Sequence, residues 1–362
     1  MEKLSPLNQL SHLKQLVSQG QPVYGVFDRV DQINYLDYHS YKLSDKAVSQ
    51  WRKKLRANQF CFVQIVQPSY RVCVAVATLN WVTSSFCYLY DEENDTLEVI
   101  EGLQPFTHNC QFNQSTYQDS IAFRSKKLTV NMEFLADGLQ LTIESKLLKL
   151  NAHLQRPYAP LSVCTPTGKK GWTYTQKEPM TEVTGELTLK NSEKIELTID
   201  LAGATATLDW SVGYMRRITN WYWTCISGYL ADGRHLGLNL ATGVNESGAS
   251  ENACWLDGER YHLPAVMFRR VKDTGTGKDT EKEMWKVTNQ PLNWSKVKID
   301  LTFTPVNCYK KNDRLVVVDS VFEQWIGYYS GVIDLGDTDL GDSGVVHINK
   351  LMGLAEDHYA KW

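Results

Sequence analysis

The sequence of 362 residues lacks an excess of charge of either sign: its formal net charge is −3, and no basic block stands out. A nucleic-acid partner is therefore not expected, because binding to phosphates needs a concentrated positive surface. The sequence also lacks the run of about 18 apolar residues that a membrane-spanning helix requires. Its first residues, Met1 to Pro6, do not form the apolar segment of a signal peptide. We therefore expect a cytoplasmic protein without a membrane span.

Several motifs of enzyme chemistry are also absent. The eight cysteines form no C-x-x-C pair, so neither a zinc ribbon nor a disulfide framework is indicated. The eight histidines occur singly, without H-x-H or H-E-x-x-H, and we expect no metal site. The G-x-S-x-G turn of serine hydrolases is missing, which speaks against Ser211 as a nucleophile. No cofactor is implied.

The composition is typical of a globular protein, with 43% hydrophobic and 22% charged residues. Apolar and polar residues alternate strictly from Lys296 to Thr304, which predicts a strand with one buried face. Turn residues predict hairpins at 136–138, where Gly138 can take a positive φ, and at 231–234. Many strands at hairpin spacing favour antiparallel β-barrels or sandwiches over a parallel α/β sheet.

Helical spacing is confined to the beginning of the chain. Leu7, Leu10, Leu13 and Leu16 follow Ser5 and Pro6 and predict a short helix, and residues 45–57 predict a second one. The length suggests two domains. The proline-rich stretch 156–179 separates the two halves, and we place the boundary near residue 200. The prediction is thus a mainly β protein of two consecutive lipocalin-like barrels or sandwiches, 1–200 and 201–362.

The segment from Leu208 to Trp223 concentrates polar and aromatic groups in a β-rich context. In an extended chain Asp209 and Ser211 share one face, while Trp210 takes the other. Two interpretations remain open for the carboxylate. It either pairs with Arg216 or Arg217 and closes a barrel end, or it faces a cavity as a proton donor or acceptor.

Further polar residues stand where core residues are expected. Asn239 lies in the middle of a predicted strand, and Glu251 and Asn252 precede the start of another. His358 lies in an unusually aromatic C-terminal segment with two acids, which indicates a tail that docks on the protein. As alternatives, these residues either face a cavity or form a structural cap.

Several of these motifs, in this order, resemble one bacterial family, the domain of unknown function 2804 (DUF2804), over nearly the whole chain. They are Gly171–Lys177, Asp209–Gly213 with Arg216, Thr219 and Trp221–Trp223, Asp232–Arg234 with Gly237–Asn239, Glu251–Asn252, and the ending Gly353–Trp362. The acid followed by a Trp/Ser/Gly element and a Trp-rich strand is also similar to the group of AttH, carotenoid hydratase and tocopherol cyclase. That resemblance implies tandem lipocalin-like barrels, and relatives that hydrate or cyclise greasy substrates.

Our hypothesis is a lipocalin-like protein that binds a hydrophobic small molecule, such as a lipid, terpenoid or polyketide-like compound, and performs cofactor-free acid–base chemistry of the hydratase, cyclase or isomerase type. The candidate catalytic residues are Asp209, Glu251 and His358. The candidate ligand-binding residues are Trp172, Ser211, Arg216, Arg217, Trp221, Trp223, Asn239 and Asn252. The alternatives are a non-catalytic carrier of a lipophilic compound and a carbohydrate-active β-sandwich. The oligomeric state is not indicated.

Overall fold

The computed structural model describes residues 10–39, 48–79, 81–105, 110–168, 170–190, 196–245, 249–273, 282–291, 295–314, 319–336 and 344–361. They form two compact units, the first ending at Arg216 and the second running from Arg217 to Lys361. Each unit is built of β-sheet and has its own apolar core. The mainly β architecture predicted from the sequence is confirmed.

Two large sheets make up the first unit. Sheet 1 has the strand order β1 (Leu10–Gln15), β4 (Gly25–Gln32), β14 (Leu161–Thr167), β15 (Gly171–Met180), β18 (Thr205–Gly213), β5 (Asn58–Val66), β6 (Tyr70–Leu79), β7 (Val82–Asp91), β8 (Thr96–Pro105). Sheet 2 has the order β17 (Glu196–Asp200), β16 (Val183–Lys190), β13 (Leu148–Gln155), β12 (Gly138–Ser145), β11 (Leu128–Phe134), β10 (Ser120–Arg124), β9 (Cys110–Gln111). The short pieces of this unit are β2 (Val17–Ser18), β3 (Gln21–Pro22), the 3₁₀ turn η1 (Tyr35–Asp37) and the helix α1 (Gln50–Arg56).

The apolar faces of sheets 1 and 2 share one core. Tyr174 and Trp210 come from sheet 1, Phe123 and Phe134 from sheet 2, and all four side chains are almost completely buried. Burying a large side chain of this kind contributes roughly 1.5–3 kcal/mol. Every position of β18 is buried, because its even-numbered residues enter this core and its odd-numbered residues are buried on the other face.

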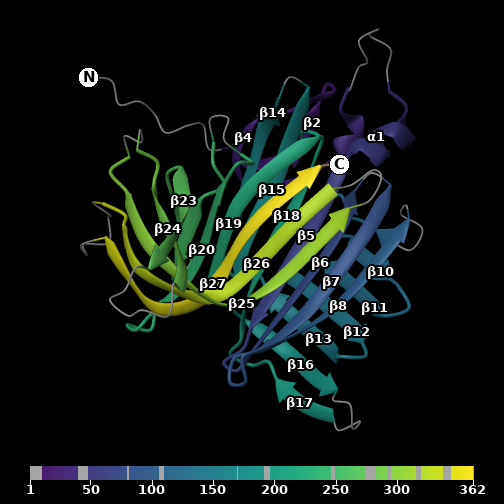
Figure 1. The fold of residues 1–362 in the computed structure, drawn as a ribbon. Coiled ribbons are helices and arrows are strands. Elements are labelled where there is room, and N and C mark those ends of the chain that lie inside the picture. Colours follow the sequence, from purple (N-terminus) through teal and green to yellow (C-terminus); the bar gives the residue numbers. More distant parts are fainter. Residues whose placement is uncertain are drawn as a thin grey trace, which may run out of the picture. The chain divides into compact units, whose positions relative to one another are not determined.

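The second unit is a single large sheet, sheet 3. Its strand order is β22 (Glu259–His262), β21 (Ala253–Leu256), β20 (His235–Thr242), β19 (Ile218–Tyr229), β27 (Val345–Lys361), β26 (Asp319–Asp334), β25 (Lys298–Arg314), β24 (Lys282–Asn289), β23 (Val266–Asp273). The long strands β25, β26 and β27 bend along their length, so that the sheet curls (Figure 1). We call the face that carries Trp285, Phe303 and Ala355 the core face. The opposite face carries Trp221 and His358.

The hairpins expected from turn residues are present. β11 and β12 pair across 135–137, and β19 and β20 pair across 230–234, each in antiparallel register. Gly138 is needed for a reason other than the expected positive φ, since its φ does not lie in that region. A Cβ at this position would lie 2.3 Å from the carbonyl oxygen of Leu154 on β13, so the glycine permits close approach of two strands.

The first predicted helix is wrong over the residues described. Leu10–Gln15 forms strand β1, which pairs in parallel with β4. Leu16 is completely buried and Leu13 packs against the core. These leucines therefore contribute to the core as part of a sheet, although their spacing suits a helix. Residues 5–9 of that prediction lie outside the described residues. The second helix is confirmed over Gln50–Arg56 as α1, while 45–47 also lie outside them.

The proline-rich stretch 156–179 is not a seam between halves. It supplies β14 and most of β15, which are interior strands of sheet 1. Because β18 follows them in the same sheet, the first unit extends to Arg216, beyond the division we expected near residue 200.

Within the described ranges, no helix is long and apolar enough to cross a membrane.

His235 at the start of β20 makes the stability of the fold depend on pH. Its side chain is buried, with Nε2 3.2 Å from the hydroxyl of Ser227, and burial lowers its pKa to about 4. The unfolded imidazole takes up a proton near pH 6.5 and the folded one near pH 4, so protons favour the unfolded state in this window. We expect the free energy of unfolding to fall by about 3 kcal/mol between pH 7 and pH 4 from this group alone.

Urea unfolding at several pH values tests this expectation. The variant His235→Asn does not titrate in this range, so its free energy of unfolding should depend less steeply on pH than that of the wild type. The exposed His347 of β27 offers the control, because His347→Asn should retain the wild-type slope. Equal slopes for the wild type and His235→Asn would contradict the assignment.

Candidate functional site

Asp209 lies in the middle of β18, on the face opposite the core of the first unit. The side chain of Lys177, directly across on β15, forms an ion pair with it, and both residues are buried. Ser211 shares this face as predicted and donates a hydrogen bond of 3.4 Å to Asp209, while its hydroxyl lies 2.8 Å from that of Thr175. The carboxylate thus has a local, hydrogen-bonded counter-ion.

The ion-pair partner of Asp209 differs from the expected one. Arg216 and Arg217, the partners expected from the sequence, follow the end of β18 and are exposed. The reason is register: a residue on a strand faces its cross-strand neighbour, and that neighbour comes from elsewhere in the sequence.

Two tryptophans of the first unit are part of its apolar core. Trp210 is completely buried and donates its indole N–H to Asn113 over 2.8 Å. Trp172, a predicted ligand-binding residue, is also completely buried and meets Tyr38 and Tyr214 edge-on, with centroids 6.1 and 5.7 Å apart. These contacts indicate packing for both rings.

We expect the variant Asp209→Asn to lower the free energy of unfolding by about 2–3 kcal/mol, because it leaves the buried ammonium of Lys177 without a counter-charge. Chemical denaturation measures the effect. The double variant Asp209→Asn with Lys177→Met should regain most of the lost free energy of unfolding, since it buries neither charge of the pair. A single variant as stable as the wild type would contradict a structural role for the pair.

In the second unit, the structure brings together two of the predicted site residues. Trp221 on β19 and His358 on β27 are cross-strand neighbours, and their ring centroids lie 4.2 Å apart. Phe322 on β26 covers the imidazole from another side, edge-on at 4.9 Å. The side chain of His358 is only 15% exposed. The imidazole therefore lies between two aromatic rings at a partly accessible position.

A polar group lies near each nitrogen of this imidazole. Nε2 lies 2.9 Å from the hydroxyl of Ser320, and Nδ1 lies 3.7 Å from Oε1 of Glu356. The carboxylate of Glu356 is itself held in place, because Trp221 donates to Oε1 over 2.8 Å and Gln324 donates to Oε2 over 2.9 Å. We call Trp221, Ser320, Glu356 and His358 the His358 cluster.

The His358 cluster combines an imidazole with a hydroxyl and a carboxylate. A histidine changes its charge near neutral pH, so it suits the role of a general acid or base. The carboxylate of Glu356 lies on the Nδ1 side of the ring, and the hydroxyl of Ser320 lies on the Nε2 side. An aromatic surround of this kind also offers apolar area to a ligand.

Other predicted residues of the second unit hold the sheet together. Trp223 donates to the side-chain oxygen of Asn239 over 2.7 Å, and the amide of Asn239 donates to the carbonyl of Glu251 over 2.6 Å. Asn252 is completely buried, accepts from the backbone of Ala241 and donates to the carbonyl of Pro264. Polar side chains in the core are thus satisfied by hydrogen bonds.

Three members of the network around His358 are not apparent from the sequence alone. Ser320 and Gln324 lie on β26, and only the register of β26 with β27 brings them to His358 and Glu356. Glu356 carried a detectable signal, because Glu356 and His358 stand two apart in an extended segment and must share a face.

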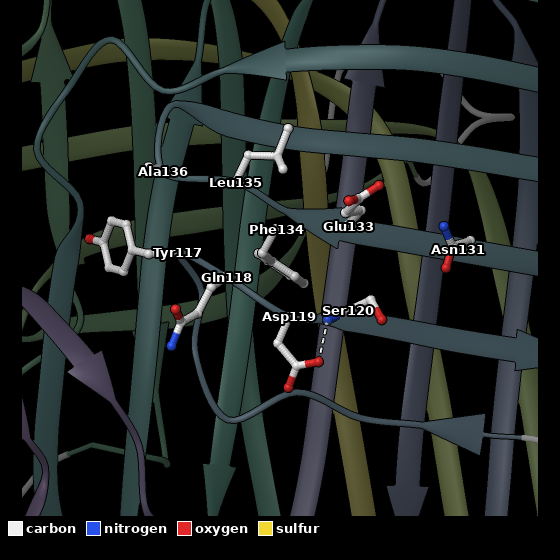
Figure 2. Close-up of a pocket in the computed structure, with 9 residues that line it drawn as sticks. All are labelled: Tyr117, Gln118, Asp119, Ser120, Asn131, Glu133, Phe134, Leu135 and Ala136. Carbon is white, nitrogen blue, oxygen red and sulfur yellow. Dashed lines mark hydrogen bonds between the residues drawn. The ribbon is translucent and has the colours of Figure 1, made fainter.

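The described residues also form an open hollow of about 430 Å³ in the first unit, distant in sequence from the predicted site. Figure 2 shows its lining side chains, which come from the approach to β10, from β11 and from the turn after it. The ring of Tyr117 is not available to stack on a ligand there, because the guanidinium groups of Arg29 and Arg156 lie 4.2 and 4.3 Å from its ring centroid.

Among the residues in the described ranges, no group of three or more His, Cys, Asp or Glu is placed to hold a metal ion.

The family model for a domain of unknown function (DUF2804) matches residues 32–362. The chain belongs to the DUF2804 family. This confirms the resemblance to DUF2804 that the sequence motifs indicate. No curated protein matches the chain.

The DUF2804 chain is also similar to solved structures. A crystal structure of CghA matches with a TM-score of 0.56 at 11% identity, covering 97% of each chain. A crystal structure of CghA with Sch210972 matches with a TM-score of 0.53 at 11% identity, covering 84% of this chain and 88% of the other. Kievitone hydratase from Nectria haematococca matches at 10% identity over 84% and 88%, with a TM-score of 0.47. The likeness to CghA shows a common fold.

Proposed function

We propose that this DUF2804 protein binds a hydrophobic small molecule and acts on it by cofactor-free acid–base chemistry, with His358 as the proton-transferring residue. Hydration, cyclisation and isomerisation are the reactions that one positioned acid–base group serves directly. The observation that carries the proposal is the His358 cluster: a partly accessible imidazole between aromatic rings, with a hydroxyl at one nitrogen and a fixed carboxylate at the other.

The roles within the cluster follow from its contacts. Glu356 accepts hydrogen bonds from Trp221 and Gln324, so it is a positioning residue that lies beside the imidazole and limits its orientation. Trp221 is half-buried and offers part of its ring to the apolar body of a ligand. The nitrogen Nε2, next to Ser320, exchanges the proton with the substrate.

The fold supports a small-molecule ligand. One of the CghA structures with this fold is a complex with Sch210972. Proteins of one fold differ in the chemistry of their sites, so the residues of this chain decide which reaction it can perform. Asp209 remains a candidate, but its ion pair with Lys177 favours a structural role, and this is why the proposal assigns the acid–base role to His358.

A non-catalytic carrier is the second reading, and one experiment addresses both. Mass spectrometry of an organic-solvent extract of the natively purified protein identifies a lipophilic compound that copurifies. Incubation of that compound with fresh protein then separates the two functions, because an enzyme converts it and a carrier returns it unchanged. An empty extract, together with no thermal shift across a panel of lipids and terpenoids, would contradict both.

A further inference from the structure

The helix α1 of the first unit carries an exposed aromatic side chain among cations. Its sequence is Gln50-Trp51-Arg52-Lys53-Lys54-Leu55-Arg56, and the side chain of Trp51 is 58% exposed. A single exposed apolar residue is common on protein surfaces. The neighbours of Trp51 therefore decide whether this surface has a function.

One side of α1 faces the protein and the other side faces solvent. Lys53 is buried, and its ammonium donates a hydrogen bond of 2.8 Å to the carbonyl of Leu36 in η1. At about 3.6 residues per turn, Trp51 and Leu55 lie on the side of the helix opposite to Lys53. Lys53 thus fixes α1 on η1 in an orientation in which the indole of Trp51 points away from the first unit.

Exposed cations flank the Trp51 side of α1. Arg52 and Lys54 lie on either side of it, Arg56 follows one turn after Arg52, and all three are exposed. The guanidinium of Arg52 lies 5.5 Å from the ring centroid of Trp51. Among the residues that the structure describes, no carboxylate forms an ion pair with Arg52, Lys54 or Arg56. Their charges are therefore not neutralised by the described part of the chain.

The local charge around α1 has the opposite sign to that of the whole chain. Residues 35–57 contain six Lys or Arg against two Asp or Glu, a net charge of +4, whereas the chain carries −3. Of these two acids, Asp37 lies within the described residues and accepts a hydrogen bond of 2.8 Å from Asn34. The positive charge concentrated at this place attracts an anionic partner.

The neighbouring strand ends add groups of the same two kinds. β5 follows α1 directly and pairs with β6 and β18, so the connection from β6 to β7 and the end of β18 lie at the same end of sheet 1 as α1 (Figure 1). Trp81 in that connection is 45% exposed, and Arg216 after β18 and Lys170 between β14 and β15 are exposed. No Asp or Glu occurs in the stretches 79–82, 167–171 and 213–216.

A tryptophan flanked by cations matches the surface of an anionic lipid bilayer. Indole rings favour the level of the lipid headgroups, where one part of the ring is in an apolar environment and the other is hydrated. Each Lys or Arg next to anionic headgroups strengthens binding about fivefold. A protein partner fits less well, because a stable protein interface buries about 800 Å² on each side. The outward side of α1 offers only the apolar area of Trp51 and Leu55.

We propose that α1 docks the protein on membranes that contain anionic lipid. The indole of Trp51 inserts among the headgroups, and Arg52, Lys54 and Arg56 lie next to the phosphates. This contact is peripheral and needs no membrane-spanning segment. It is independent of the acid–base role proposed for His358, which belongs to the second unit.

Cosedimentation of the full chain with lipid vesicles tests the proposal. The protein should bind vesicles of phosphatidylcholine with about one-third phosphatidylglycerol, and it should bind pure phosphatidylcholine at least about tenfold more weakly. Binding should weaken as the salt concentration rises, because salt screens exposed charges. The triple variant Arg52→Gln, Lys54→Gln, Arg56→Gln should lose about a hundredfold in affinity for the anionic vesicles. Trp51→Ala should lose about tenfold, because less apolar area leaves water.

The matched control removes three exposed cations from other strands. The triple variant Lys149→Gln, Arg269→Gln, Lys298→Gln makes the same change in net charge and should bind the anionic vesicles nearly as the wild type does. Vesicles with brominated acyl chains should quench the fluorescence of the wild type more than that of Trp51→Phe, which reports insertion of this ring. His358→Gln should bind the vesicles like the wild type.

Three outcomes would overturn the proposal. The first is equal affinity for the neutral and the anionic vesicles, and the second is an equal loss in the α1 triple variant and the control triple variant. The third is binding to polyglutamate without binding to vesicles, which would identify an acidic protein as the partner instead.

Discussion

The variant His358→Gln is expected to lower kcat for the compound that copurifies with the protein by about 10²- to 10⁴-fold, the usual contribution of a positioned acid–base group. Glutamine preserves a side chain that can hydrogen-bond to Ser320 but cannot accept or release a proton. The aromatic neighbours Trp221 and Phe322 remain in place. The dissociation constant of the compound should therefore change much less than kcat, and steady-state kinetics with equilibrium binding measure the two separately.

A second histidine on the same strand offers the control. His347 is exposed on β27, so His347→Gln should leave both kcat and the dissociation constant as in the wild type. Glu356→Gln should lower kcat less than His358→Gln does, because the amide can still accept a hydrogen bond from Trp221 while its charge is lost. Retention of the wild-type kcat in His358→Gln would exclude this residue as the acid–base group.

The variant Arg156→Met is expected to lower the free energy of unfolding by about 3–5 kcal/mol, because it leaves a buried carboxylate without its counter-ion. Arg156 pairs with Glu178, whose side chain is fully buried beside Gln176 in the core of the first unit. Burial already raises the pKa of Glu178, and Arg156 opposes that rise. In the folded variant, Glu178 therefore takes up a proton. The folded state binds this proton more tightly than the unfolded chain does, because the buried carboxyl has the higher pKa.

The sign of the pH dependence identifies the mechanism. A carboxyl whose pKa is higher in the folded than in the unfolded state stabilises the fold as the pH falls. Urea unfolding of Arg156→Met should therefore show a smaller deficit at pH 5 than at pH 7. Adding Glu178→Gln should restore most of the stability at both pH values, because no buried charge remains.

Arg29 provides the matched control for Arg156. Both guanidinium groups lie over the ring of Tyr117, but Arg29 pairs with the accessible Asp31 and is 44% exposed. Arg29→Met should cost no more than about 1 kcal/mol. If the two single variants lost equal stability, the stacking on Tyr117 rather than the buried ion pair would be the cause.

The strands and hairpins could be read from the sequence because their signals are local. Alternation predicted the strand within Lys298–Arg314, and turn residues predicted the pairs β11–β12 and β19–β20. The same alternation placed Asp209 and Ser211 on one face and Trp210 on the other, as observed. The leucine spacing at the beginning of the chain is local as well, but pairing of β1 with β4 overrode it.

The sequence by itself determined that this protein is a mainly β member of DUF2804. It also indicated Asp209, Trp221 and His358 as candidate site residues, because an ordinary apolar core does not require them. Only the tertiary structure decided their partners: Lys177 for Asp209, and Ser320 with Glu356 for His358. The same holds for Arg270 on β23, whose acidic partners Glu283, Glu323 and Asp357 lie on three other strands. Side-chain alternation is a property of one strand, whereas cross-strand neighbours follow from sheet order and register, which join segments far apart in the sequence.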